Sequence, residues 1–258
     1  MAIKINTEKR IFTLETKHTM YQMQADTYGV LRHLWYGAKT GCDMSYLQDY
    51  PDVGFSGNPH DAGNDRTYSL DTLPLEYAGA GIGDFRVPAV EAVHADGSCA
   101  LDLRYYSHTV KQGKYAIAGL PALYAGEDEA ETLEVVLRDT ASAVEVTLKY
   151  GVLPELDIVT RCAEIRNLGE APVTLTKAAS LCLDMGQGSW EWIHCYRCST
   201  AFRRVPAPAV RPVITRIPPC CSAHRTARKP PVPAWGRLWS TAAATRPRSS
   251  ATSWGRCV

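Results

Sequence analysis

The sequence predicts an all-β fold, a large antiparallel β-sandwich, followed by a C-terminal tail that is disordered or irregular. Two observations in residues 1–184 predict the sandwich. Short β-rich segments, several with apolar and polar residues in alternation, recur between turn sequences, and helical periodicity over 11 or more residues is nearly absent. The tail is predicted by an abrupt change of composition after His194.

The first strands are expected at residues 10–16, 19–25 and 30–36. The segments "RIFTLET" and "TMYQMQA" are rich in β-forming residues, and a Tyr28-Gly29 turn separates the second from "VLRHLWY". Short connections of this kind favour antiparallel neighbours, so the three segments are predicted to form a meander.

Further strands are expected on both sides of two turn sequences and in two stretches of alternating residues. "VPAVEAVH" and "ALDLRYYSH" flank Asp96-Gly97, which predicts a hairpin. Strict alternation marks residues 133–137 and 144–150, where one face is expected to be buried and the other polar. The segments 156–167 and 172–184 form another predicted strand pair, across Gly169. No βαβ rhythm is present, which favours a sandwich.

The composition divides the chain into residues 1–194 and residues 195–258. All 27 acidic residues precede the boundary, together with 16 of the 28 basic residues, whereas the last 64 residues hold 12 basic residues and no acidic ones. Nine of the 16 prolines and five of the nine cysteines also lie in the tail. The first part is the predicted domain, and the second is predicted to be irregular.

The expected location is the cytoplasm, without membrane association. No apolar run approaches the roughly 20 residues that a membrane span needs, and the N-terminus lacks a signal-peptide pattern. Cys42, Cys99, Cys162 and Cys182 are scattered without ligand-type spacing, so they are predicted to be buried apolar residues rather than disulfide partners. The dispersed histidines, including His33 and His108, are interpreted as sheet residues, and no metal site is predicted in the domain.

One segment, residues 52–86, is too long for a simple connection. It is rich in Gly, Asn, Asp and Pro and carries four aromatic residues. A loop of this length is either disordered or functional, and its aromatic residues favour an ordered, functional loop.

The same loop carries a family resemblance. "FSGNP", "DRTYSLDTLPLEY" and "GDFR", followed in order by "LRYYSH", "GLPALY", "EAETLEVVLRD", "VTRCAEIRN" and "SLCLD", resemble the N-terminal domain of bacterial α-galactosidases of glycoside hydrolase family 36. The similarity runs from about Ile11 to His194.

The resemblance implies a β-supersandwich that precedes a catalytic (β/α)8 barrel. In the family, the barrel hydrolyses terminal α-linked galactose in oligosaccharides such as melibiose and raffinose, with retention, by means of two carboxyl groups about 5 Å apart. Both family aspartates lie in barrel motifs with no counterpart here, so no catalytic residue and no cofactor is predicted, and the chain alone is expected to be an inactive fragment. The implied partners are α-galactoside oligosaccharides, and the parent enzyme is expected to be a homo-oligomer.

The resemblance implies one substrate-binding residue, Asp52. Family members carry an aspartate three residues before the Phe-Ser element of this loop, and it accepts hydrogen bonds from galactose hydroxyls, a task that suits an ionised carboxylate. The other interpretation is a solvated loop aspartate. Asp65 and Arg66 suggest a sugar clamp or a structural ion pair, and the structural pair is preferred. Asp71 and Glu76 are not expected to form a glycosidase pair, because sequence spacing does not set their separation.

The tail allows three interpretations. Resemblance stops after "EWIH", whose tryptophan lines the galactose pocket in some members, and the Arg-, Pro- and Cys-rich residues beyond it are typical of a GC-rich coding sequence read out of frame. Cys195 and Cys198 with Cys220, Cys221 or His224 offer zinc-ligand types. Eleven arginines with Trp235, Trp239 and Trp254 suggest a nucleic-acid arm. Only a frameshift near codon 194 explains why the resemblance ends so abruptly, so neither zinc nor nucleic acid is predicted as a partner.

Two functions remain open at this stage. The preferred one is an N-terminal fragment of an α-galactosidase, and the alternative is a non-catalytic carbohydrate-binding or oligomer-assembly β-sandwich domain.

Overall fold

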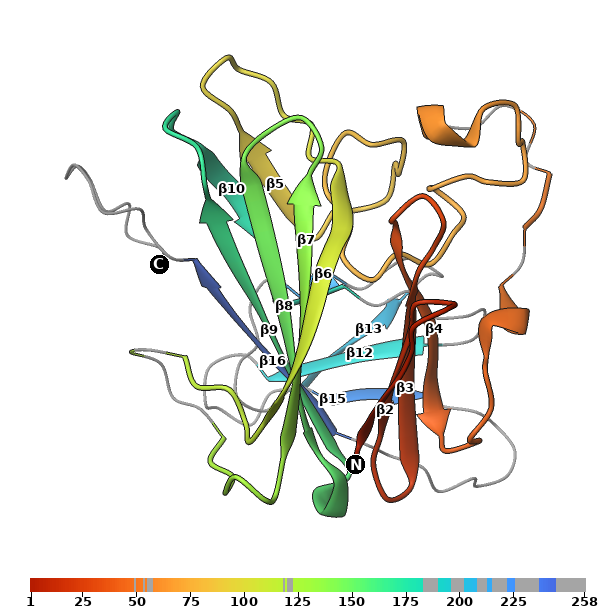
Figure 1. The fold of residues 1–258 in the computed structure, drawn as a ribbon, viewed down its shortest axis with the longest axis vertical. Helices are drawn as coiled ribbons and strands as arrows, with labels where there is room; N and C mark the ends of the chain where they lie inside the picture. The colour runs from red at the N-terminus through yellow and green to blue at the C-terminus, as the bar shows by residue number, and fades with distance from the viewer. Residues whose placement is uncertain are drawn as a thin grey trace.

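A computed structural model gives the fold of the chain (Figure 1). It describes residues 1–48, 50–52, 54, 58–117, 119 and 123–182, and beyond them the backbone of five strands between residues 190 and 244. The strands are β1 (Ile3–Asn6), β2 (Ile11–Glu15), β3 (Thr19–Ala25), β4 (Leu31–Ala38), β5 (Val90–Val93), β6 (Leu103–Gln112), β7 (Glu131–Asp139), β8 (Val144–Leu153), β9 (Ile158–Asn167), β10 (Thr174–Ala178), β11 (Leu181–Cys182), β12 (Trp190–Cys195), β13 (Phe202–Ala207), β14 (Val213–Ile214), β15 (Ser222–Arg225) and β16 (Arg237–Ala244).

Helices contribute little to the part of the chain that is described. They comprise three 3-10 turns: η1 (Ser45–Leu47), η2 (His60–Ala62) and η3 (Pro154–Leu156). Within the same residues, no helix has the length and apolar character to cross a membrane.

The first sheet is the antiparallel meander β1-β2-β3-β4, which confirms the prediction for residues 10–36. Opposite Gln22 and Met23 the register shifts by one residue, which leaves Leu34 of β4 without a partner in the ladder and forms a β-bulge in β4. Gly29 makes the turn before β4 with φ +79°, a conformation that favours glycine. The Gly29 carbonyl accepts a hydrogen bond from the backbone N–H of Tyr105 (2.7 Å), which ties this turn to the opposite sheet.

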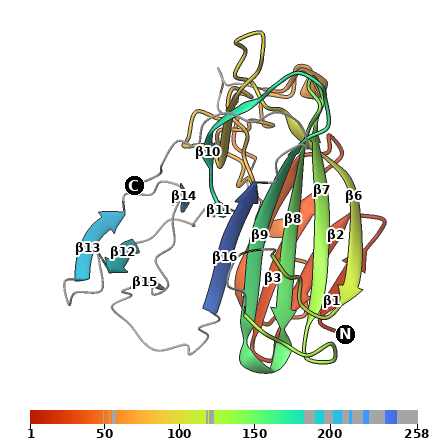
Figure 2. The same cartoon turned by 90° about the vertical axis from the view of Figure 1, so that its left-hand side faces the viewer.

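The second sheet has the order β16-β9-β8-β7-β6 and faces the first (Figures 1 and 2). Strands β6 to β9 are antiparallel neighbours, whereas β16 pairs with β9 in parallel. Strand β8 is buried on both faces along most of its length, because it is the central strand of the sheet.

One hydrophobic core fills the space between the two sheets. Apolar side chains from the meander meet the alternating residues of β7, β8 and β9, which gives an aligned sandwich. The fully or almost fully buried members include Phe12, Leu14, Tyr21, Met23, Leu133, Val135, Val146, Leu148, Tyr150 and Ala163.

Two predicted strand pairings are wrong. Residues 94–98 do turn, since the Gly97 N–H donates to the His94 carbonyl (2.9 Å), but β5 pairs with β10 and β6 pairs with β7. The pair expected across Gly169 also separates, because β9 pairs with β8. In both cases the turn carries the chain from one sheet to another, so the strands on either side of it do not pair with each other.

The structure describes four short strands, β13 to β16, in the segment predicted to be irregular. Strands β13 and β15 flank β12, and β14 pairs with β11. The rest of the tail lies outside the described residues.

Candidate functional site

The long loop has a buried inner part. Val30, Tyr68, Leu70, Leu73 and Leu75 belong to a small apolar cluster beneath it, separate from the main core. Burial of this cluster keeps the inner loop on the sandwich, in line with the order that its aromatic residues predict.

Polar groups fix the same inner part. The Tyr68 hydroxyl donates to Asp26, and burial together with the Asp26 charge raises the pKa of Tyr68. Arg86 donates from Nη2 to the carbonyls of Leu70 (2.8 Å) and Leu73 (2.7 Å), and its Nε bonds to Asp84 Oδ1 (2.9 Å). The "GDFR" element therefore clamps the loop backbone.

Asp52 lies on the exposed outer part of the loop. Its Oδ1 accepts the Gly54 N–H (3.0 Å) and lies 3.0 Å from Arg66 Nη2. The side chains of Asp52 and Arg66 are 59% and 62% exposed, so a solute can reach both. No described residue bonds to Oδ2, which leaves that oxygen accessible. Gly54 has φ +72°, and this turn aims its N–H at the carboxylate.

Arg66 forms an ion pair with Asp52 rather than with its neighbour Asp65. The Asp65 carboxylate instead accepts the Thr67 N–H (2.9 Å) and the Thr67 hydroxyl (2.6 Å), and these bonds lower the pKa of Asp65. Asn58 donates to the Asp65 carbonyl (2.6 Å). The structure therefore brings together Asp52 and Arg66, two candidate residues that the sequence analysis treated separately.

Asp71 and Glu76 do not make a glycosidase pair. The Asp71 carboxylate accepts the hydroxyl of Ser69, whereas Glu76 is fully buried and forms an ion pair with Arg161 (Nη1–Oε1, 2.7 Å). Burial alone would raise the pKa of Glu76, but Arg161, His33 and Tyr21 hold it below its ordinary value. A carboxylate so enclosed cannot contact a substrate.

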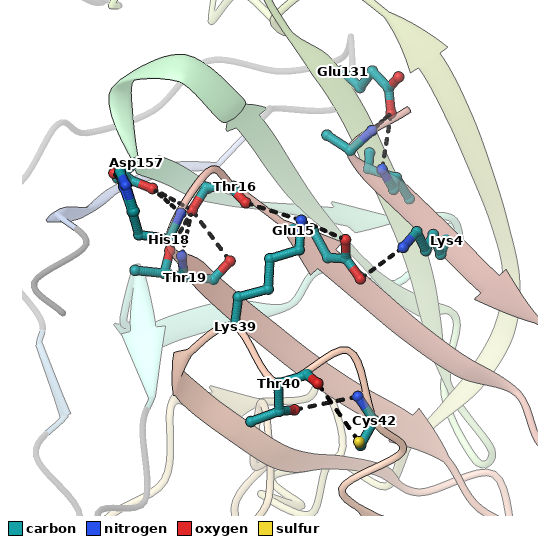
Figure 3. Close-up of polar contacts among 12 residues, drawn as sticks. Lys4, Glu15, Thr16, His18, Thr19, Lys39, Thr40, Cys42, Glu131 and Asp157 are labelled. Carbon is teal, nitrogen blue, oxygen red and sulfur yellow. Dashed lines mark hydrogen bonds and ion pairs between the residues drawn. The ribbon is translucent and has the colours of Figure 1, made fainter.

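A second polar region lies where the β2–β3 turn meets the β8–β9 connection (Figure 3). Asp157 Oδ1 accepts the Thr16 hydroxyl (2.7 Å) and the His18 N–H (2.8 Å), and His18 Nδ1 lies 2.6 Å from Asp157 Oδ2. Nearby, Glu15 pairs with Lys4 and Lys39, each at 2.9 Å. Sequence reasoning missed this region, because its partners are far apart in the chain.

The second region is structural. It borders an open depression of about 200 Å³ lined by both acidic and basic residues. Burial tends to raise the pKa of Glu15, but hydrogen bonds and charges from Lys39 and Lys4 lower it on balance. Asp157 and Glu15 are each held by donors on neighbouring segments, and the Asp157 contacts join the β2–β3 turn to the β8–β9 connection, so we interpret the region as structural.

The predictions for cysteine and histidine are partly confirmed. Cys162 and Cys182 are buried thiols outside any disulfide, but Cys42 and Cys99 are exposed, because each lies in a surface connection between strands. His33 and His108 lie in β4 and β6, as predicted. Among the residues that the structure describes, no group of three or more His, Cys, Asp or Glu could hold a metal ion. The side chains of Cys195, Cys198, Cys220, Cys221 and His224 lie outside those residues.

The fold and the loop together define the class of protein. In a two-layer β-sandwich the connecting loops lie at the surface of a rigid scaffold, which is where binding residues are most often found. Residues 29–196 match the glycosyl hydrolase family 36 N-terminal domain. The chain belongs to glycosyl hydrolase family 36 and contains its N-terminal domain, as the sequence resemblance predicts.

Named relatives agree with this assignment. The chain is 50% identical over 196 residues to a bifunctional α-galactosidase/sucrose kinase of Mediterraneibacter gnavus (76% of this chain, 21% of the relative). It is 39% identical over 197 residues to α-galactosidase AgaA of Geobacillus stearothermophilus (75% of this chain, 27% of the relative). The chain thus spans about a quarter of the length of these relatives.

Solved structures share the fold. The galactosidase domain of an α-galactosidase-sucrose kinase matches with a TM-score of 0.77 and 47% identity, over 80% of this chain and 29% of that one. A structure of the Geobacillus stearothermophilus enzyme AgaA in complex with raffinose matches with a TM-score of 0.71 and 35% identity, over 77% of this chain and 28% of that one. These matches confirm the β-sandwich prediction.

Proposed function

We propose that this domain presents Asp52 to the galactose of an α-galactoside, as part of an α-galactosidase. The observation that carries the proposal is the arrangement of Asp52. Its carboxylate is exposed, one oxygen is held by Gly54 and Arg66, and the other is accessible. An oriented carboxylate makes strong hydrogen bonds to hydroxyl donors, and the hydroxyls of a sugar are such donors.

The substrate class of the parent enzyme belongs to the same proposal. Solved relatives hold raffinose and stachyose, which carry terminal α-linked galactose. The parent enzyme would hydrolyse that linkage, also in melibiose, with retention through a nucleophile and an acid/base 5–5.5 Å apart. In this domain Glu76 is buried and Asp65 is held by Thr67, and we assign the chemistry to a separate catalytic domain. The 258-residue chain alone should not turn over a chromogenic α-galactoside.

Titration with galactose tests the role of Asp52. In ¹H–¹⁵N spectra of the full chain, the amide of Gly54 should shift as galactose is added, because this N–H bonds to the Asp52 carboxylate. Asp52→Asn should weaken the apparent affinity by about tenfold, since a hydrogen bond to a charged group contributes about 1.5–3 kcal/mol.

Asp43→Asn is the matched control, because Asp43 is also a loop aspartate in an ion pair, with Lys9 at 2.8 Å. It should leave the titration unchanged. Shifts that persist in Asp52→Asn, or that centre on Asp43, would contradict the proposal.

Three further parts of the proposal concern the parent protein. We place it in the cytoplasm, as a homo-oligomer, and we attribute residues 195–258 to a shifted reading frame. The arginine-rich composition of the tail and its lack of acidic residues support the last point.

A further inference from the structure

The proposed sugar site makes no use of the most deeply buried charged pair in the described domain. Glu76 and Arg161 both have fully buried side chains, and Arg161 is the largest fully buried residue described. Burying two charges is costly unless they are paired and hydrogen-bonded, so the surroundings of this pair must supply partners.

Those partners come from both sheets. Arg161, on β9, lies 2.7 Å from Glu76 Oε1 through Nη1 and donates from Nη2 to the Glu76 backbone carbonyl (2.9 Å). The hydroxyl of Tyr21, on β3, lies 2.6 Å and 2.8 Å from the two carboxylate oxygens. The hydroxyl of Tyr150, on β8, donates to Oε1 (2.8 Å). The Glu76 carboxylate, which belongs to the loop, thus contacts strands of both sheets.

Residues 50 and 75–76, which bracket the part of the loop that carries Asp52 and Arg66, converge on β4. Leu75 forms an antiparallel bridge with Arg32, and the Glu76 N–H donates to the Leu31 carbonyl (3.0 Å). The guanidinium of the same Arg32 donates to the hydroxyl of Tyr50, two residues before Asp52. A shift of Glu76 relative to β4 would therefore disturb the contacts of β4 with Leu75 and with Tyr50.

We propose that Glu76 and Arg161 are positioning residues for Asp52, because their buried pair anchors the loop end to both sheets. The pair acts through the loop backbone and does not contact the sugar. The Asp52–Arg66 ion pair is exposed to water and screened by salt, so it contributes little to holding the loop in place. Buried contacts elsewhere in the loop must therefore fix its position. The importance of the anchor for sugar binding rests on the proposed function, but the anchor itself can be tested without sugar.

Hydrogen exchange followed by mass spectrometry on the full chain tests the anchor. Glu76→Gln keeps the side-chain shape and removes the charge that Arg161 needs. Exchange in peptides that cover residues 44–54 and 58–76 should accelerate at least tenfold, whereas exchange in residues 131–153 should not change. Arg161→Lys should accelerate loop exchange less than Arg161→Met, because a lysine keeps the charge and loses the forked donors.

Glu164→Gln is the matched control. Glu164 lies on β9, the same strand as Arg161, and its ion pairs in the described part of the chain are with Lys149 (2.7 Å) and Arg166 (2.5 Å), neither of which belongs to the loop. It should leave loop exchange unaltered. Should Glu76→Gln fail to fold, Tyr150→Phe replaces it, because this substitution removes one hydroxyl that donates to Glu76. The same peptides are then compared, and exchange should again accelerate in the loop and not in residues 131–153.

Two results would overturn the proposal. One is equal acceleration of exchange in the loop and in residues 131–153, which would show a purely global effect on stability. The other is loop exchange that does not change in Glu76→Gln or in Arg161→Met. Neither result depends on galactose, so failure of the anchor is distinguishable from failure of Asp52 to bind sugar.

Discussion

Leu148→Ala tests whether the two sheets enclose a single core. Leu148 is fully buried in the central strand β8, opposite Val135 of β7 and Ala163 of β9. The substitution removes three carbon groups, and at about 0.8 kcal/mol per group the lost transfer free energy is about 2–3 kcal/mol. The cavity left behind adds to this cost, so the expected loss in the free energy of unfolding is about 3–5 kcal/mol.

Urea unfolding followed by far-ultraviolet circular dichroism measures this loss. A domain of this size should also lose about 2–4 °C in Tm for each kcal/mol, so the Tm should fall by roughly 6–20 °C. The matched control is Leu168→Ala, because Leu168 is 56% exposed, and it should change stability by less than about 0.5 kcal/mol. Equal losses in the two variants would refute the single-core architecture.

Two further predictions concern pH and backbone packing. The pKa of Asp157 is lowered, so its contribution to stability is present above the ordinary value of 3.8 and is lost as the pH falls through the folded-state value. Between pH 6 and pH 3 the urea midpoint should therefore fall more in the wild type than in Asp157→Asn, and equal slopes would contradict this role. Gly79→Ala places a Cβ 2.0 Å from the Leu101 carbonyl oxygen and should cost about 3 kcal/mol or more, whereas Gly126→Ala, with its nearest contact at 3.4 Å, should be nearly neutral. Similar urea midpoints for the two alanine variants would show that Gly79 is not needed for this close approach.

Local pattern predicted the strands well. Residues 19–25 form β3 with the expected bounds, and the alternation at 133–137 and 144–150 lies within β7 and β8. Strand partners were harder to predict, because Asp96-Gly97 turns the chain without pairing the strands on either side. A turn sequence specifies local backbone geometry, whereas the choice of sheet depends on burial against distant strands.

The candidate site shows the same division. Asp52 is proposed from a motif. Its ion-pair partner Arg66 lies 14 positions away across the loop, whereas the sequence suggested a pair between Arg66 and its neighbour Asp65. The anchor at Glu76 was not predictable, since Tyr21, Tyr150 and Arg161 lie 55, 74 and 85 residues from it. Only the packing of two sheets brings such residues together.

The nucleotide sequence around codon 194 tests the central claim most directly, namely that residues 1–194 are the N-terminal domain of an α-galactosidase and that the tail is read out of frame. We expect that a change of frame near this codon restores a coding sequence for the catalytic barrel, with its two carboxylates. An intact upstream frame, with no nearby frame that encodes a barrel, would contradict it.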